Sequence, residues 1–267
     1  MPKRWAIYKI GKVPLGAFFV GIDVFGAFLC LARILHIRGR RKSKRRLVMK
    51  KFTKTTRTLA ALLVSGTALT GVASAAEITG NVGATTDYIW RGNTQAGGDA
   101  SLSGGIDIDF GNGLAAGTWV GSLGASGSDD ANYEQDLYVS YSTEIAGYPL
   151  EVGYISYMYP GVADSDADFA DFYVSTSVAG LGISYYMLAS AENDAFDAQE
   201  GTYLSLDYDY DLGDDWTMSL HYGMESFDTD PDDEDTSISL SKGDMTFTVS
   251  GDEGDDTRAI VSWGASF

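Results

Sequence analysis

The chain has a single cysteine among its 267 residues, Cys30, and this residue lies in a basic N-terminal stretch. One thiol cannot form an intramolecular disulfide, so a secreted domain stabilised by disulfides is excluded. Basic residues are almost absent further along: of the 19 Lys and Arg, only Arg91, Lys242 and Arg258 follow residue 76. Three cations give nucleic acid no basic surface to bind, so we expect no nucleic-acid partner.

Long apolar runs are also missing from Glu77 onward. No stretch there reaches the 18 residues that indicate a transmembrane helix, and no window shows helical periodicity of useful length. Acidic residues are abundant instead, because only Asp23 of the 37 Asp and Glu precedes Glu77. Such a break in composition is typical of a processing boundary.

The segment that starts at Met49 reads MKKFTKTTRTLAALLVSGTALTGVASAAE and has the three parts of a secretory signal. A basic start is followed by an apolar stretch and then by small residues, which predicts cleavage after Ala75 or Ala76. The upstream residues 1–48 could be a membrane anchor with a basic flank. We favour a start codon assigned too early, because two export signals in tandem would be redundant.

We therefore expect an upstream extension at 1–48, a signal peptide at 49–76 and one mature domain at 77–267. The mature domain alternates apolar and polar residues with period two, as strands with two different faces do. Its last ten residues, RAIVSWGASF, show this pattern and end on an aromatic side chain. The pattern predicts twelve strands, at 78–92, 100–110, 114–123, 135–145, 150–159, 171–179, 181–189, 202–211, 216–226, 236–242, 245–251 and 258–267.

The connections between these strands alternate in length. Short turns such as GNG at 111–113 alternate with mostly longer, Asp-rich loops such as FDTDPDDED at 227–235. Short periplasmic turns and longer extracellular loops are typical of outer-membrane barrels. A soluble β-sandwich could show the same alternation of residues. The export signal, the even strand number and the terminal Phe267 favour a closed antiparallel transmembrane β-barrel of the bacterial outer membrane.

The apolar face of such a barrel contacts outer-membrane lipid. We expect Tyr88, Trp90 and Tyr222 in the outer aromatic girdle, and Trp119 to face outward with Leu123. Four further aromatics are expected in the periplasmic girdle: Phe110, Tyr210, Trp216 and Phe267. The strand that ends at Phe267 resembles the recognition signal that barrel-assembly machinery reads, which makes that machinery an expected partner.

The polar face lines the barrel interior. Its charged members are the candidate pore-lining residues: Asp87, Arg91, Asp107, Asp109, Asp136, Glu151, Asp207, Asp209, Glu225 and Arg258. Clustered carboxylates attract cations and repel anions, so we expect a channel for passive diffusion of small cations or neutral solutes. In the alternative interpretation the carboxylates pair with Arg91 and Arg258 or hydrate, and the protein is a non-conducting structural or surface-interaction barrel.

Two acidic loops offer weak candidates for a metal site. Their alternating carboxylates are Asp164, Asp166 and Asp168, and then Asp228, Asp230 and Asp232. Both loops lack the glycine and the bidentate glutamate of an EF-hand, which favours solvated loops and no metal. His221 and Ser219 share a predicted face but form no nucleophile motif, so we expect neither an enzyme nor a cofactor.

Several motifs in order also resemble a known family. GNVGATTDYIWRGNTQ (80–95), LSGGIDIDF (102–110) and GLAAGTWVGS (113–122) are similar to the opening of the TorF family of porins. YEQDLYVSYSTEIAG (133–147), VGYISYMYPG (152–161) and ADFYVSTS (170–177) resemble the middle of that family. The resemblance covers most of residues 77–267 and implies an outer-membrane β-barrel that acts as a pore. It does not extend to the first 48 residues, and the very acidic loops depart from it.

Overall fold

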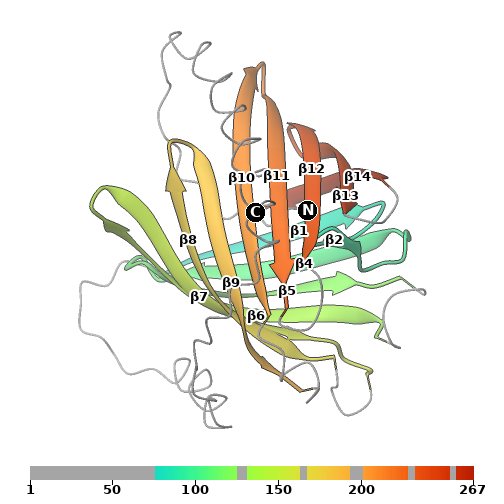
Figure 1. The fold of residues 1–267 in the computed structure, drawn as a ribbon, viewed down its shortest axis with the longest axis horizontal. Helices are drawn as coiled ribbons and strands as arrows, with labels where there is room; N and C mark the ends of the chain where they lie inside the picture. The colour runs from blue at the N-terminus through green and yellow to red at the C-terminus, as the bar shows by residue number, and fades with distance from the viewer. Residues whose placement is uncertain (1–75, 125–130, 163–166, 193–200, 228–231, 253–256) are drawn as a thin grey trace. The chain divides into compact units, whose positions relative to one another are not determined.

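The computed structural model describes residues 76–124, 131–162, 167–192, 201–227, 232–252 and 257–267. The upstream extension and all of the signal peptide except Ala76 lie outside these ranges, so the domain division stays a prediction. The strands run in chain order (Figure 1) as β1 (Glu77–Thr85), β2 (Ile89–Trp90), β3 (Asn93–Thr94), β4 (Ser101–Asp109), β5 (Leu114–Ser122), β6 (Tyr133–Ile145), β7 (Tyr148–Met158), β8 (Phe169–Val178), β9 (Leu181–Ala191), β10 (Thr202–Gly213), β11 (Trp216–Ser226), β12 (Asp233–Lys242), β13 (Met245–Asp252) and β14 (Arg258–Ser266).

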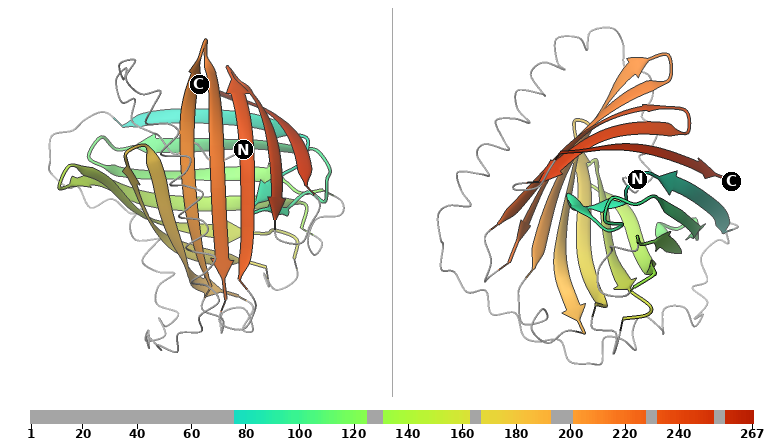
Figure 2. Two further views of the ribbon diagram at one scale, coloured as in Figure 1. Left: turned by 45° about the horizontal axis from the view of Figure 1, so that its top comes forward. Right: turned by 90° about the vertical axis from the view of Figure 1, so that its right-hand side faces the viewer.

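Strand β1 and strands β4 to β14 form one closed antiparallel barrel. Each strand pairs with its neighbours in the chain, and β1 closes the ring by pairing with β4 on one side and β14 on the other. In Figure 2 the green strands and the orange strands cross at a steep angle, as the tilted strands of two barrel walls do. The predicted all-β closed barrel of twelve strands is confirmed.

The first and last strands meet through backbone hydrogen bonds. The N–H of Gly80 donates to the carbonyl of Phe267 at 2.8 Å, and the N–H of Phe267 donates back to Gly80 at 3.0 Å. The Phe267 ring lies across Gly80, where a Cβ atom would come within 2.7 Å of it. A glycine at this position therefore lets the terminal aromatic lie flat against the first strand.

Turn lengths follow the predicted asymmetry. At one end of the barrel the connections span 110–113, 146–147, 179–180, 214–215 and 243–244. The connections at the other end are longer, at 86–100, 123–132, 159–168, 192–201, 227–232 and 253–257. Both ends of the barrel chain, the start of β1 and the end of β14, lie at the short-turn end because the strand number is even.

The strand predicted for 78–92 is wrong in its second half. β1 ends at Thr85, and the chain then turns into the barrel interior, where β2 and β3 form a small hairpin. The two hairpin-turn residues, Arg91 and Gly92, have φ angles of 47° and 80°. Two-residue hairpin turns require such positive φ values, which end the extended run. We call residues 86–100 the lumenal segment.

Cross-strand register decides which side chains face outward. The outer face carries large apolar residues, among them Leu102, Ile106 and Phe247, which are 70%, 51% and 48% exposed. The inner face carries mostly Ser, Thr, Gly, Tyr and acidic residues, as in the pairs Ser239 with Thr248 and Ser175 with Ser184. This is the alternation that the sequence predicts.

Trp119 faces inward, so the prediction that it faces outward with Leu123 is wrong. Its cross-strand partners are Gly105 and Asp136, which both face the interior. Leu123 belongs to the same interior cluster. Strand β5 has small residues on both faces, so its sequence shows too little contrast to indicate the buried face.

Among the residues that the structure describes, no helix is long and apolar enough to span a membrane.

The inward orientation of Trp119 leads to a prediction about the free energy of unfolding. Trp119→Ala removes an interior ring that packs on Tyr88 at a centroid distance of 5.4 Å, so we expect a loss of about 3 kcal/mol or more in the free energy of unfolding. The control Trp263→Ala, on the outer face and 41% exposed, should cost less. Denaturant unfolding of the two purified variants measures the difference, and equal losses would contradict the inward orientation.

Candidate functional site

The lumenal segment lies inside the barrel and contacts inward-facing residues of several strands. Near its start, the Tyr88 ring packs on Trp119 of β5, and its hydroxyl donates a 2.8 Å hydrogen bond to Glu134 Oε2 of β6. At the hairpin, the Trp90 ring lies 5.8 Å from the rings of Tyr157 on β7 and Phe169 on β8. The segment is thus packed against one whole side of the interior.

The hairpin turn reaches the opposite wall. A Cβ atom on Gly92 would lie 2.6 Å from Asp235 Cβ on β12 and 3.1 Å from Asp252 Cβ on β13. Any larger residue would clash with this wall, and its positive φ also favours glycine. Gly92 therefore allows the backbone of the turn to lie directly against the inner surface of the barrel.

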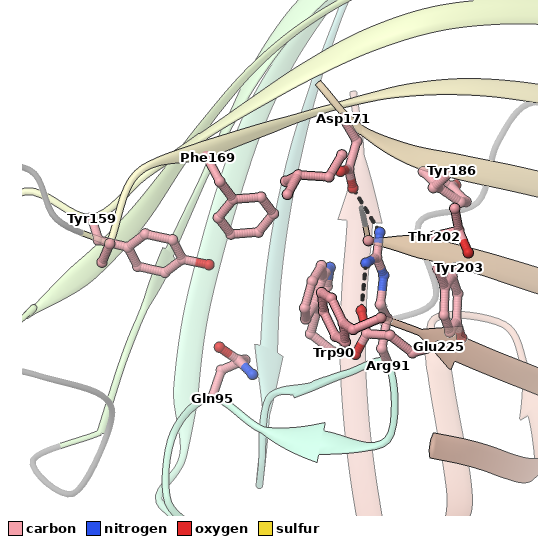
Figure 3. Close-up of a pocket in the computed structure, with 14 residues that line it drawn as sticks. Trp90, Arg91, Gln95, Tyr159, Phe169, Asp171, Tyr186, Thr202, Tyr203 and Glu225 are labelled. Atoms are coloured by element: carbon pink, nitrogen blue, oxygen red, sulfur yellow. Dashed lines mark hydrogen bonds and ion pairs between the residues drawn. The ribbon is translucent and has the colours of Figure 1, made fainter. Parts of the chain in front are cut away.

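Arg91 is the central charged group of the site. Its Nη2 donates to Asp171 Oδ2 at 2.7 Å and its Nη1 donates to Glu225 Oε1 at 2.8 Å (Figure 3). The Arg91 side chain is 10% exposed, and the two acidic side chains are 3% and 16% exposed. Charge-assisted pairs with so little access to water are strong and geometrically specific.

Aromatic rings surround the same guanidinium. The Arg91 Cζ atom lies 4.2 Å from the centroid of the Trp90 ring and 4.5 Å from that of Tyr203, within the range of cation–π attraction. Tyr186 is a third ring, at 5.4 Å. Figure 3 shows the guanidinium held between these rings and the two carboxylates.

The charge of Arg91 is stable in this setting. The Asp171 and Glu225 carboxylates accept its hydrogen bonds at 2.7 Å and 2.8 Å and favour the protonated form. An arginine guanidinium is not deprotonated in proteins, so Arg91 keeps its positive charge.

Polar contacts fix the flanks of the hairpin. The Thr94 hydroxyl donates to Asp87 Oδ1 at 2.6 Å, and the Gln95 N–H donates to the Tyr88 carbonyl at 2.6 Å. Asp87 in turn pairs with Arg258 of β14 at 3.5 Å. The segment is therefore tied to the wall on the β14 side as well.

A cavity of about 410 Å³ lies beside Arg91. Its lining combines aromatic and polar groups, as Figure 3 shows. The residues that line it are Trp90, Arg91, Gln95, Tyr159, Ala167, Phe169, Asp171, Tyr186, Leu188, Gly201, Thr202, Tyr203, Glu225 and Phe227.

A second polar cluster continues from Tyr203 toward the short-turn end. The ring nitrogens of His221 lie 2.7 Å from Asp207 Oδ1 and 2.8 Å from Asp235 Oδ1. The Tyr203 hydroxyl donates to Asp235 Oδ2 at 3.0 Å and lies 3.1 Å from His221 Nε2. This cluster and the Arg91 pairs form one network across β8, β10, β11 and β12.

The remaining predicted interior residues occupy separate places. Asp107 accepts hydrogen bonds from Tyr138 and Asn81, and Glu151 accepts hydrogen bonds from Ser142 and Tyr173.

The register places Asp136, Asp209 and Glu225 on the inner face of their strands. Asp109, at the end of β4, accepts the N–H of Gly111 in a short turn. The structure thus brings Arg91 and Glu225 together, and Asp87 and Arg258, but leaves Asp107 and Glu151 apart from both pairs.

The sequence analysis missed several interior carboxylates, among them Glu134, Asp171 and Asp235. Glu134 and Asp235 lie just outside the predicted strands 135–145 and 236–242, and Asp171 lies on the boundary residue of 171–179. Extending the period-two alternation by one residue at the loop ends of two strands would have found Glu134 and Asp235, and applying it to the first residue of 171–179 would have found Asp171.

The expected outer-girdle positions of Tyr88 and Trp90 are wrong, because both side chains pack inside the barrel. In the acidic loops, Asp164, Asp166, Asp228 and Asp230 lie outside the described residues. Asp168 accepts the Tyr159 N–H at 2.8 Å and Asp232 accepts the Ser226 hydroxyl at 2.7 Å. The described ranges contain no group of three or more side chains that could hold a metal ion.

The ion pairs of Arg91 lead to a second prediction about the free energy of unfolding. Asp171→Ala removes one of the two carboxylates that pair with the buried Arg91 guanidinium, so we expect a loss of about 3 kcal/mol or more in the free energy of unfolding. The control Asp209→Ala removes a carboxylate near the short turns and should change it by less than about 0.5 kcal/mol. Unfolding in urea measures both values, and a small effect of Asp171→Ala would show that Arg91 does not depend on it.

Solved structures similar to this chain are outer-membrane porins. The KdgM porin is 13% identical, with 72% of this chain and 98% of that chain covered and a TM-score of 0.43. The NanC porin is 10% identical, with 71% and 98% covered and a TM-score of 0.41. OccAB4 of Acinetobacter baumannii is 12% identical, with 63% and 54% covered and a TM-score of 0.34. No curated protein matches the sequence.

One family model matches residues 70–256, and its description is "Bacterial protein of unknown function (Gcw_chp)". The match spans well over half of the chain and carries a different name from the TorF family, which stays a prediction. The protein belongs to the Gcw_chp family of bacterial proteins.

Proposed function

We propose that the protein is a porin-type channel of the bacterial outer membrane, through which small solutes diffuse passively with a preference for cations. The observation that carries the proposal is a closed barrel with an apolar exterior and a carboxylate-lined interior. An apolar exterior is costly in a barrel that stays in water, and a charged interior is expected of an ion-conducting pore.

The exterior supports contact with lipid. Residues from β1 to β14 expose large apolar side chains, including Ile78 at 68%, Leu137 at 48% and Val261 at 42%. Soluble monomers rarely expose apolar surface on this scale. A closed ring leaves no unpaired strand edge, which is the condition for a sheet in hydrocarbon. Trp216 and Phe267 lie exposed at the short-turn end, where a periplasmic girdle would lie.

The interior supports cation preference. Carboxylates line the inner face of most strands, and the basic side chains that face them in the described ranges are Arg91, Arg258 and His221. The groups that donate hydrogen bonds to Asp107 and Glu151 are neutral. A low-dielectric wall focuses the field of such carboxylates into the lumen and concentrates cations there.

A specific observation also favours the second candidate, a non-conducting barrel that acts structurally or through its Asp-rich loops. An aromatic cluster around Tyr157, Tyr159 and Tyr173 fills part of the interior next to the lumenal segment. If this packing leaves no continuous path, the carboxylates serve to hydrate and brace the barrel.

Bilayer electrophysiology decides between these functions. Protein extracted from the outer membrane of bacteria that express the complete gene is inserted into a planar bilayer, with a KCl gradient across it. We expect ohmic conductance and a reversal potential displaced toward the potassium equilibrium value. Neutralising Asp107 and Glu151 as Asn and Gln should reduce that displacement at about 0.1 M salt, where charges act over about 10 Å.

The matched control is Asp214→Asn, which removes an acidic charge from a short turn and not from the inner wall. It should leave the reversal potential unchanged. Absence of current from a barrel that shows heat-modifiable migration would contradict the channel and support the non-conducting candidate. A reversal potential on the chloride side would contradict the cation preference alone.

Export is a further part of the proposal. We propose that residues 49–76 act as a cleaved signal peptide, that residues 1–48 are an upstream extension, and that the strand ending at Phe267 is read by the barrel-assembly machinery. We expect mass spectrometry of the outer-membrane protein to find an N-terminus at Ala76 or Glu77. Peptides from residues 1–48 in the mature protein would contradict this processing.

A further inference from the structure

We propose that the lumenal segment, residues 86–100, forms the constriction of this channel and that Arg91 is the residue that sets its charge selectivity. The inference rests on the proposed channel function and adds to it the position and the chemistry of the selectivity site.

The first step is that the segment crosses the lumen. Its side chains and backbone contact inward-facing residues on strands from β5 to β14, with Trp119, Asp171 and Asp235 as examples on three different walls. A chain segment that contacts inward residues all around a closed ring lies across the space that they enclose. A solute on its way through the barrel must therefore pass beside residues 86–100.

The second step is that the segment is fixed in place. Arg91 binds two strands through separate hydrogen bonds, the Gly92 backbone lies against a third wall, and Asp87 pairs with Arg258 on a fourth. These anchors come from both sides of the hairpin turn. A constriction held in this way keeps one shape and can discriminate between solutes.

The third step concerns charge. Arg91 is the basic side chain beside the cavity of about 410 Å³, and the carboxylates beside that cavity are Asp171 and Glu225. With Arg91 present the three groups carry a net charge of −1, and without it they would carry −2. Arg91 thus limits how strongly the constriction attracts cations, and it is placed to repel divalent cations more than monovalent ones.

The fourth step concerns the solutes that fit beside Arg91. The cavity presents the aromatic faces of Trp90, Tyr159 and Phe169 together with the amide of Gln95 (Figure 3). The acidic groups of the lining are already paired to Arg91, so an anion finds no unpaired positive charge there. Monovalent cations and uncharged polar molecules match this lining.

Arg91 variants test the charge role. In Arg91→Ala we expect a larger single-channel conductance and a reversal potential closer to the potassium value, since one unit charge about 4 Å away changes local ion concentration about fivefold even in water. Arg91→Lys keeps the charge but not the planar fork, so selectivity should stay near that of the original protein. Heat-modifiable migration verifies that each barrel is folded.

The matched control is Lys242→Ala. Lys242 packs over the outward-facing Trp216 ring, with its Nζ 5.1 Å from the centroid, and not on a lumenal residue. Its removal changes the net charge of the protein by the same amount and should change neither conductance nor selectivity. At about 1 M KCl, where screening acts within about 3 Å, the selectivity shift of Arg91→Ala should shrink while any gain from widening persists.

A second measurement leaves the ion pairs of Arg91 intact. Asn93 is exposed beside the hairpin turn, so Asn93→Cys in a Cys30→Ser background presents one thiol inside the lumen. We expect a bulky cationic methanethiosulfonate reagent to reduce the current of open channels. The same reagent should have no effect on the Cys30→Ser protein.

The outcomes separate this inference from the function on which it rests. Unchanged selectivity in folded Arg91→Ala, or unchanged current after labelling of the Asn93→Cys variant, would overturn the constriction while the channel function stands. Absence of current from the original protein and from every variant would overturn both.

Discussion

Closure of the strand ring is the constraint on which the rest of the structure depends. Pairing of β1 with β14 satisfies the backbone groups of both strands and fixes the register, so that every second residue faces the interior. Once the register is fixed, the outer residues form a continuous apolar surface and the inner residues meet across the lumen. The contacts of Arg91 with Asp171 and Glu225 exist because closure brings β8 and β11 to the same space.

The barrel interior is packed in two different ways, with aromatic side chains in one part and charged side chains in another. Around Tyr157 and Tyr173 the aromatic rings pack as in a soluble core. Around Arg91 and His221 the interior is packed with polar groups, and each of these two basic side chains lies between two carboxylates. Burying such groups is costly unless all are paired, so the network constrains where the lumenal segment can lie. The proposed selectivity and the rigidity of the site therefore have the same physical source.

The strands could be predicted from the sequence because period-two alternation reports directly on two contrasting faces. Prediction failed where that contrast is weak or misleading. Trp119 lies on a strand of small residues, and only pairing with Asp136 reveals its face. Tyr88 and Trp90 continue the alternation of β1 because the hairpin that carries them is itself extended. The turn at Arg91 and Gly92 depends on contacts with β8 and β11, which lie about 80 and 134 residues away.

The position of residues 86–100 inside the ring has a consequence for the order of assembly. The segment precedes β5 to β14 in the chain, and yet it contacts inward residues contributed by strands as late as β14. Its contacts with Asp171, Glu225 and Arg258 can therefore form only when β8, β11 and β14 are in place. Hairpins between neighbouring strands form through local contacts, whereas the junction of β1 and β14 joins the most distant parts of the domain. The ion pairs of the segment thus report on the finished ring, because each joins residues that only the assembled barrel brings together.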